Sequence, residues 1–274
     1  MTDGAAGPTR RQCVTMRRSP SRRESGQAAV ETAIVMPLFV FMMMGLIQLG
    51  LAHQARLMTR YAAYKATRAG AIHRAKKDVM TNAALAVLVP LLPGPDGKIR
   101  PPKDEGSYAT AWQQVKNNQY QNGPKMVITT ICNPTTNGSG ATGRLSPNDD
   151  FDDPQVASGR DGDWVGFKRT RLHAQITFNY ELLIPFANGI LFWATVGVKP
   201  DNQETFNTLR LRNRTSSDQA SSSATTAQTL ISHAKQGRYF LPIRANWAMR
   251  LQSNVAQGEL PTSNDCKVNF NQGS

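Results

Sequence analysis

Residues 33–52 read AIVMPLFVFMMMGLIQLGLA, and this stretch decides the architecture of the chain. It contains one polar side chain, that of Gln48. A helix rises about 1.5 Å per residue, so this one would span about 30 Å, the thickness of a bilayer's hydrocarbon core. Buried helices of soluble proteins rarely run this long without a charge. The stretch therefore predicts a membrane span at residues 33–52.

A polar, basic tract occupies residues 1–26, ahead of this span. It holds six arginines and two acids, six minus two or +4, and it has no regular apolar spacing, so we expect no stable fold there. A secretory signal peptide has a similar order, but its apolar core is shorter, and no small-residue cleavage site stands out here. The arginines favour a cytoplasmic N-terminus, although four basic residues soon after the span weaken that preference.

Glu31 lies two positions before the apolar run, at the predicted membrane boundary. A carboxylate at this depth is costly unless it has a partner, and that cost is a reason to expect a function. An acid at the start of a helix is also favoured by the helix dipole, without any further role. The residue alone leaves both interpretations open.

The residues around Glu31 resemble the processing site of a prepilin. A basic leader ends at Gly26, an acid stands at the fifth position after it, and a long apolar helix follows. In the type IV pilin superfamily a membrane-embedded peptidase cuts directly after this glycine, on the cytoplasmic side. The cut would free the amine of Gln27, one helical turn from Glu31, to neutralise that carboxylate in its own chain or in a neighbour. The resemblance thus assigns Gly26 and Gln27 to cleavage and Glu31 to register between subunits.

Residues 26–71 as a whole are similar to the TadE/TadG-like family of the tight-adherence, or Flp-type, pilus system. The similarity rests on an acid, a proline six positions later and a glycine late in the span, here Glu31, Pro37 and Gly45. The family pattern then has an acid-aromatic-Gly triplet, which corresponds here to residues 48–50. An Ala- and Arg-rich helix that ends near a glycine follows.

This resemblance implies a structural protein, a pseudopilin or minor-pilin-like component in assembly of a tight-adherence pilus or a related secretion system. Its partners would be the inner membrane, a prepilin peptidase, and other pilins, pseudopilins and pilus-assembly proteins. The protein would cross the bacterial inner membrane once, with a cytoplasmic N-terminus and a periplasmic head that becomes extracellular in a pilus. Thr32 and Gln48 depart from the family pattern. Larger TadG-type relatives can keep their anchor, so cleavage and retention of the leader both stay open.

The first helix is expected to continue beyond the membrane, so that residues 27–77 form the transmembrane and extended helix and residues 78–274 form the head. On a helical wheel, small side chains share one face of the extension and basic side chains share the opposite face. They are Ala55, Ala62, Ala66 and Ala69 against Arg56, Arg60 and Arg68. Small residues at this spacing allow another helix or a sheet to approach closely.

Three segments of the head predict strands, which makes the fold class α+β. Residues 125–132 are rich in β-branched side chains, whereas residues 172–182 and 243–251 alternate between apolar and polar side chains. Such alternation predicts a small antiparallel sheet with one wet face. Short helices are expected at residues 78–89 and 107–119.

Two exposed loops are expected at residues 133–162 and 201–228. The first holds four aspartates at positions 149–153, but their spacing is not that of an EF-hand, so a solvated loop is favoured over a calcium site. Residues 182–198 are nearly as apolar as the span, but they are short and are interrupted by a proline and a glycine. We interpret them as buried or lying at a membrane interface, with a second span as the rival interpretation.

The cysteines fit a head outside the cytoplasm. Cys13 lies in the leader, whereas Cys132 and Cys266 follow the span. In an oxidising compartment these two would persist as a disulfide between the central strand region and the C-terminal tail. Two unrelated buried thiols are the alternative.

Composition excludes several classes of protein. A hydrophobic fraction of 40% is too low for a polytopic membrane protein and too high for a wholly disordered chain. The sequence shows no phosphate-binding glycine loop, nucleophile elbow or histidine pair at metal-ligand spacing, so we expect no enzyme, metal or cofactor. The net charge of +13 supports one rival function, an uncleaved membrane-anchored envelope protein whose basic head binds polyanions or cell-envelope polymers. No specific nucleic acid is expected.

Overall fold

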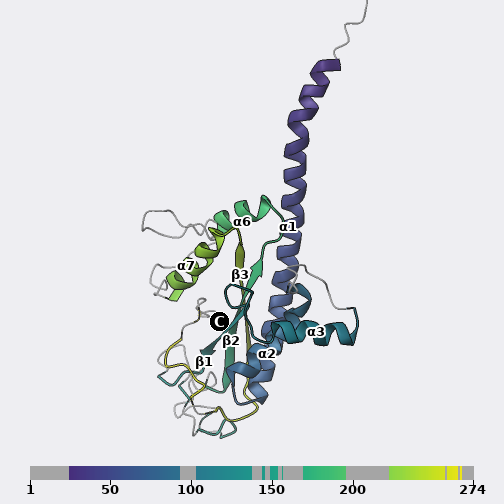
Figure 1. Cartoon of the computed structure of the whole chain (residues 1–274). Coiled ribbons are helices and arrows are strands. Elements are labelled where there is room, and N and C mark those ends of the chain that lie inside the picture. The colour runs from purple at the N-terminus through teal and green to yellow at the C-terminus, as the bar shows by residue number, and fades with distance from the viewer. Residues whose placement is uncertain are drawn as a thin grey trace, which may run out of the picture. The chain divides into compact units, whose positions relative to one another are not determined.

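The computed structural model describes residues 25–92, 103–137, 144–145, 149–153, 156, 169–195, 222–256, 258–264 and 266. Residues 1–24 of the predicted leader, and parts of both predicted loops, lie outside this set. The chain divides into two compact units, Met1–Met42 and Met43–Ser274. The first unit holds the beginning of helix α1, and the second holds the rest of α1 and the head (Figure 1).

Helix α1 (Ser25–Ile72) is the longest element, with 48 residues. Within the described part of the chain, one helix, Ala29–Ile72, is long and apolar enough to cross a membrane. The expected end near residue 77 is wrong, because a Schellman-type cap closes the helix earlier. Arg74 adopts a left-handed backbone with φ of 60°, and Ala75 N–H donates to the carbonyl of Gly70 at 2.8 Å.

Among the described residues, three short helical elements lie between the end of α1 and residue 115. Helix α2 (Lys77–Leu88) continues into a 3₁₀ turn, η1 (Val89–Leu91), where Pro90 ends the α-helical hydrogen bonding. Helix α3 (Glu105–Val115) begins two residues before the predicted start and ends four before the predicted end. It starts at a capping box, in which the Asp104 carboxylate accepts from Ser107 N–H at 2.9 Å.

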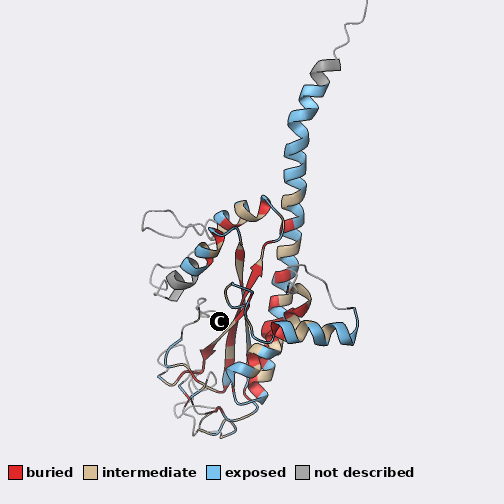
Figure 2. Ribbon diagram, viewed as in Figure 1, coloured by how far each residue is buried: buried red, intermediate tan, exposed pale blue. Residues whose placement is uncertain are grey.

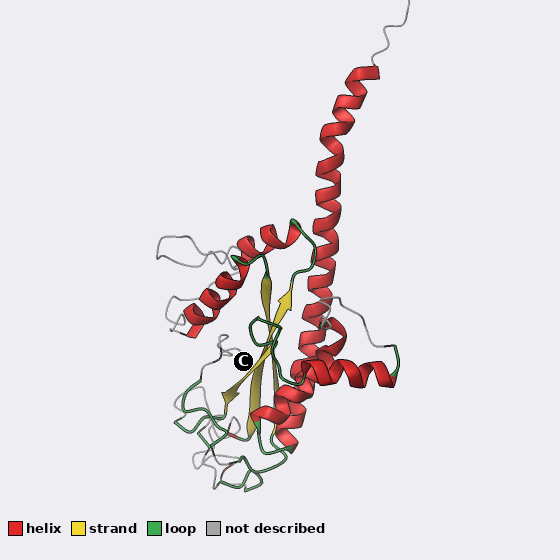
Figure 3. Cartoon of the chain, in the orientation of Figure 1, coloured by secondary structure: helices red, strands yellow, loops and turns green. Residues whose placement is uncertain are grey.

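The head contains a three-stranded antiparallel sheet in the order β1-β2-β3 (Figure 3). Its strands are β1 (Val127–Asn133), β2 (Arg171–Glu181) and β3 (Phe240–Arg250). The alternating patterns located both long strands to within three residues, and the α+β prediction of a long helix packed on a small antiparallel sheet is confirmed.

The expectation of one wet face is wrong for the central strand β2. Its polar residues Gln175, Thr177 and Asn179 are buried. Asn179 Nδ2 donates to the carbonyl of Lys125 at 2.8 Å, and the hydroxyl of Tyr120 donates to the carbonyl of Asn179 at 2.7 Å. The chain just before β1 therefore covers part of the face that the pattern assigned to water.

Helix α7 (Ser222–Ala234) corrects the second predicted loop, which was expected to run to residue 228. Its Ser/Thr-rich sequence hides the helical signal, although Leu230 and Ala234, four residues apart, are both buried. Residues 201–221 of that loop lie outside the described residues. The apolar segment at residues 182–198 contains a different short helix, α6 (Ala187–Thr195).

Candidate functional site

The residues assigned to cleavage and register lie at the beginning of helix α1, in the first unit. Gly26 and Gln27 belong to its first turn, and Glu31 is an exposed residue one turn further on. Because α1 is helical throughout this stretch, Gln27 and Glu31 stand four residues apart on one face. This spacing would let a free Gln27 amine reach the Glu31 carboxylate after a cut.

An apolar arm follows, which we define as residues 30–42. Its large apolar side chains are between 48% and 71% exposed, and their positions in the sequence lie on all sides of the helix rather than in one stripe. Figure 2 shows the ribbon of this stretch coloured as exposed. A helix that is apolar on every side belongs in a lipid bilayer or among other helices, not in water. Pro37 lies inside this arm and has no N–H to donate, so the carbonyl of Ala33 loses its usual helical partner.

The part of α1 in the second unit changes character and gains a buried face. Ala55, Ala62 and Ala66 are fully buried, as the small-residue pattern predicts, and Ala69 is half-buried. The arginines predicted opposite, at positions 56, 60 and 68, are all exposed. The small face lets the sheet come close to the helix. Trp247 on β3 is one example, because its carbonyl accepts from the Thr67 hydroxyl at 3.5 Å.

Gln48, the single polar residue of the predicted span, is fully buried in the second unit. Its Oε1 accepts a hydrogen bond from the backbone N–H of Ile184 at 3.0 Å, whereas its Nε2 has no hydrogen-bond partner among the described residues. This bond attaches α1 to the apolar segment that leads into α6. Sequence reasoning noted Gln48 as unusual but did not identify this attachment.

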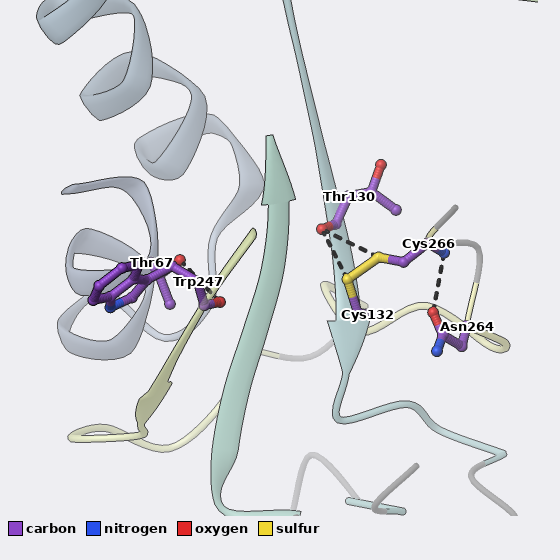
Figure 4. Close-up of a disulfide and its surroundings, with 6 residues drawn as sticks. All are labelled: Thr67, Thr130, Cys132, Trp247, Asn264 and Cys266. Carbon is purple, nitrogen blue, oxygen red and sulfur yellow. Dashed lines mark hydrogen bonds between the residues drawn. A yellow bond between two sulfur atoms is a disulfide. The ribbon is translucent and has the colours of Figure 1, made fainter. Parts of the chain in front are cut away.

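Cys132 and Cys266 are joined in a disulfide, with their Cα atoms 5.3 Å apart and 134 positions apart in sequence (Figure 4). The bridge lies at the end of strand β1, where both sulfurs are within 4.0 Å of the Thr130 carbonyl oxygen. Asn264 Oδ1 accepts from Cys266 N–H at 3.0 Å and so fixes the approach of the tail. The structure thus brings together two of the residues singled out in the sequence.

The other polar candidates do not converge on a reaction centre. Among the residues that the structure places, no three His, Cys, Asp or Glu side chains gather as a metal site would require. His173 lies partly buried in the sheet, and this burial, with a smaller contribution from Arg171, lowers its pKa to about 4. Burial likewise raises the pKa of Tyr120, whose hydroxyl donates to a backbone carbonyl. Burial within the fold accounts for both pKa shifts, so neither shift indicates a catalytic group.

One comparison with known proteins agrees with the character of α1. A protein-family model described as TadE-like protein matches residues 26–68. Neither the comparison with curated proteins nor that with solved structures gave a match. The matched region contains Gly26, Gln27, Glu31, the whole apolar arm, Gln48 and most of the small buried face. The chain thus carries a TadE-like domain at residues 26–68.

Proposed function

We propose that this chain is a pseudopilin or minor-pilin-like component that acts in assembly of a tight-adherence pilus or a related secretion system. The TadE-like domain at residues 26–68 is the observation that carries the proposal, because TadE-like proteins are pilus components rather than enzymes. The domain implies association with the pilus machinery. The specific role and the partners, a prepilin peptidase and other pilins or pseudopilins, are the proposed part.

The apolar arm explains how one subunit could reside first in the lipid bilayer and later among the helices of an assembly. Its side chains lie on all sides of the helix, so they fit lipid in a stored subunit and neighbouring helices in an assembly equally well. Glu31 stands at the beginning of the arm. Moving this carboxylate into an apolar environment is favourable only beside a cation, and the Gln27 amine of a neighbouring subunit would supply one.

The disulfide supports a head outside the cytoplasm. Disulfides persist in the periplasm or outside the cell and are rare in the cytosol, and the Cys132–Cys266 bridge lies wholly in the second unit. With one candidate span in the described residues, the bridge supports a cytoplasmic N-terminus and a periplasmic head.

The decisive experiment is the N-terminal sequence and intact mass of the protein isolated from its own cell membranes. A chain that begins at Gln27 supports prepilin processing. A chain that keeps Arg22 and Arg23 overturns the pseudopilin mechanism and favours the fixed anchor whose basic head binds polyanions, in a manner that salt weakens. A thiol label gives an independent readout, because Cys13 lies in the leader and a cut chain carries one fewer free thiol.

Substitution of Glu31 tests the register role separately from cleavage. Glu31→Gln should leave the amount of membrane-inserted protein unchanged and lower its recovery in isolated pili or assembly complexes. Glu31→Asp should retain part of the function because it keeps the charge. Glu105→Gln is the matched control, since Glu105 is also an exposed acid near the start of a helix, but in α3 of the head. Unchanged assembly of Glu31→Gln would exclude this role.

A further inference from the structure

Helix α6 and the residues that lead into it present two different faces. On one face Phe192 is fully buried, with its ring centroid 5.5 Å from that of Tyr239. Gly189 packs against the Tyr239 ring, because an added Cβ would stand 3.7 Å from the tyrosine hydroxyl oxygen. On the other face Ile190 is 71% exposed and Trp193 is 46% exposed, and Phe186 is exposed beside them. Positions 190 and 193 fall on one side of α6, and Phe186, with a left-handed φ of 65°, immediately precedes the helix.

The exposed face of α6 has the wrong composition for water. A surface helix of a soluble domain normally presents charged or polar side chains outward. No charged residue occurs between Glu181 and Lys199, and the large exposed side chains are a phenylalanine just before the helix and an isoleucine and a tryptophan within it. Helices that lie in a membrane interface carry such a face, and tryptophan is enriched there because its ring is apolar and its N–H is polar.

The bond from Gln48 sets the position of this face along α1. Because Gln48 Oε1 accepts from Ile184 N–H, the segment entering α6 lies beside position 48, four residues before the predicted end of the span at residue 52. Four residues correspond to about 6 Å along a helix. Interfacial helices bury their apolar faces to a depth of about 5–10 Å. The distance of about 6 Å between position 48 and the predicted end of the span falls within this range. On α1 itself Leu46, Ile47 and Leu49 are exposed at the same level.

We infer that α6 lies in the interface of the bilayer that α1 crosses, with Phe186, Ile190 and Trp193 among the acyl chains of the leaflet on the side of the head. The occupant of this face is phospholipid. The face lies at the same height along α1 as the exposed apolar side chains of the span, and it carries no charge that could recognise a protein partner. The inference rests on the proposed anchoring by α1, but not on cleavage or on pilus assembly. It makes the head a domain that rests on the membrane surface.

Two tryptophans of nearly equal exposure provide a matched test. Trp193 is 46% exposed and Trp247 is 43% exposed. Trp247 contacts Tyr64, which is sixteen residues beyond Gln48, or about 24 Å further along α1. Trp193 should therefore be in lipid and Trp247 in water. Single-tryptophan chains are obtained with W112F/W164F/W247F and with W112F/W164F/W193F.

Each full-length chain is reconstituted into vesicles of phosphatidylethanolamine and phosphatidylglycerol, with and without bromine on the acyl chains. Bromine should quench Trp193 emission at least about twofold and leave Trp247 unchanged, since quenching requires contact with the apolar region. No quenching of Trp193, as expected if a second copy or another protein covers the face, would overturn the inference. Equal quenching of both tryptophans would also overturn it, because the head would then be adsorbed without a defined orientation.

A simpler comparison guards against misfolding of the triple variants. In the otherwise unaltered chain, Trp193→Phe alone should remove most of the quenchable emission. An unchanged quenchable fraction would overturn the inference. Resistance of the chain to extraction by alkaline carbonate reports separately on anchoring by α1. Loss of that resistance would overturn the anchoring as well, whereas a retained leader together with quenched Trp193 would overturn only the pseudopilin role.

Discussion

Trp247 on strand β3 meets Tyr64 on helix α1 edge to face, with ring centroids 5.5 Å apart and planes at 82°. A second contact reinforces it, because the Thr67 hydroxyl lies 3.5 Å from the Trp247 carbonyl oxygen. The edge-to-face arrangement is favourable because the positive edge of one ring lies against the negative face of the other. The pair therefore contributes to holding the sheet against the helix within the second unit.

A double-mutant cycle on this pair should show coupling. Tyr64→Ala and Trp247→Ala should each lower the free energy of unfolding of the head, and the double variant should lose less than the sum. The expected coupling is about 0.5–1.5 kcal/mol. Denaturant unfolding in detergent micelles, followed by near-ultraviolet circular dichroism, measures it. Strictly additive losses would show that the two rings contribute independently.

Gly70 is required for close packing of α1 on the sheet. A Cβ at this position would stand 2.7 Å from Met80 Sδ and 2.8 Å from Leu172 Cδ2, and both of these residues are fully buried. Gly70→Val should lower the free energy of unfolding by about 1–3 kcal/mol, because the added side chain would overpack the core. Gly106→Val in α3 is the control, since no atom lies within 4 Å of its added Cβ. Equal effects at both sites would contradict the packing argument.

The Cys132–Cys266 bridge should be a major source of stability for the head. It closes a loop of 134 positions, for which restriction of the unfolded chain corresponds to a gain of up to about 5 kcal/mol. Reduction should lower the melting temperature of the head accordingly. The double variant C132S/C266S should melt at the reduced temperature and should not respond to reductant. A response of the double variant would point to another reducible group.

Acid should destabilise the head through His173. Burial lowers its pKa from 6.5 to about 4, so the folded state keeps this imidazole neutral while the unfolded state takes up a proton. Its contribution is fully present above about pH 6.5 and is lost as the pH falls towards 4, by at most about 3 kcal/mol. His173→Gln should flatten the dependence of melting temperature on pH in this window. The exposed His73, changed to glutamine, is the control.

The attachment at Gln48 should contribute to stability through its carbonyl oxygen. Gln48→Met keeps the shape of the side chain but removes the acceptor of Ile184 N–H, so the free energy of unfolding should fall by about 1–3 kcal/mol. Gln114→Met on the exposed face of α3 should have little effect. Slower hydrogen exchange at Ile184 in the native chain than in Gln48→Met would locate the loss at this bond.

Strong periodicity made α1 and the two long strands predictable from sequence. An uninterrupted apolar run has one stable environment, and strict alternation in β2 and β3 leaves one choice of inward face. The end of α1 was placed too late because Arg74 adopts the left-handed conformation that glycine usually occupies at a helix end. The start of α7 was missed because its first turns are serine, threonine and alanine.

The remaining features depend on contacts between distant parts of the chain. Alternation identified the apolar face of β2, but it could not show that the Asn179 side chain donates to the carbonyl of Lys125 or that the Tyr120 hydroxyl donates to the Asn179 carbonyl. Gln48 stood out as the single polar residue in an apolar run, yet its partner Ile184 is 136 positions away. Such bonds are decided by the tertiary fold, so local patterns do not report them.

The disulfide also determines what becomes of a damaged molecule. The covalent ring that it closes contains β2, α6, α7 and β3, whereas α1 precedes the ring. A protease that cuts the backbone anywhere inside this ring leaves both pieces linked through Cys132 and Cys266. A nicked head would therefore stay attached to its anchor and would be released only if the bridge were also reduced.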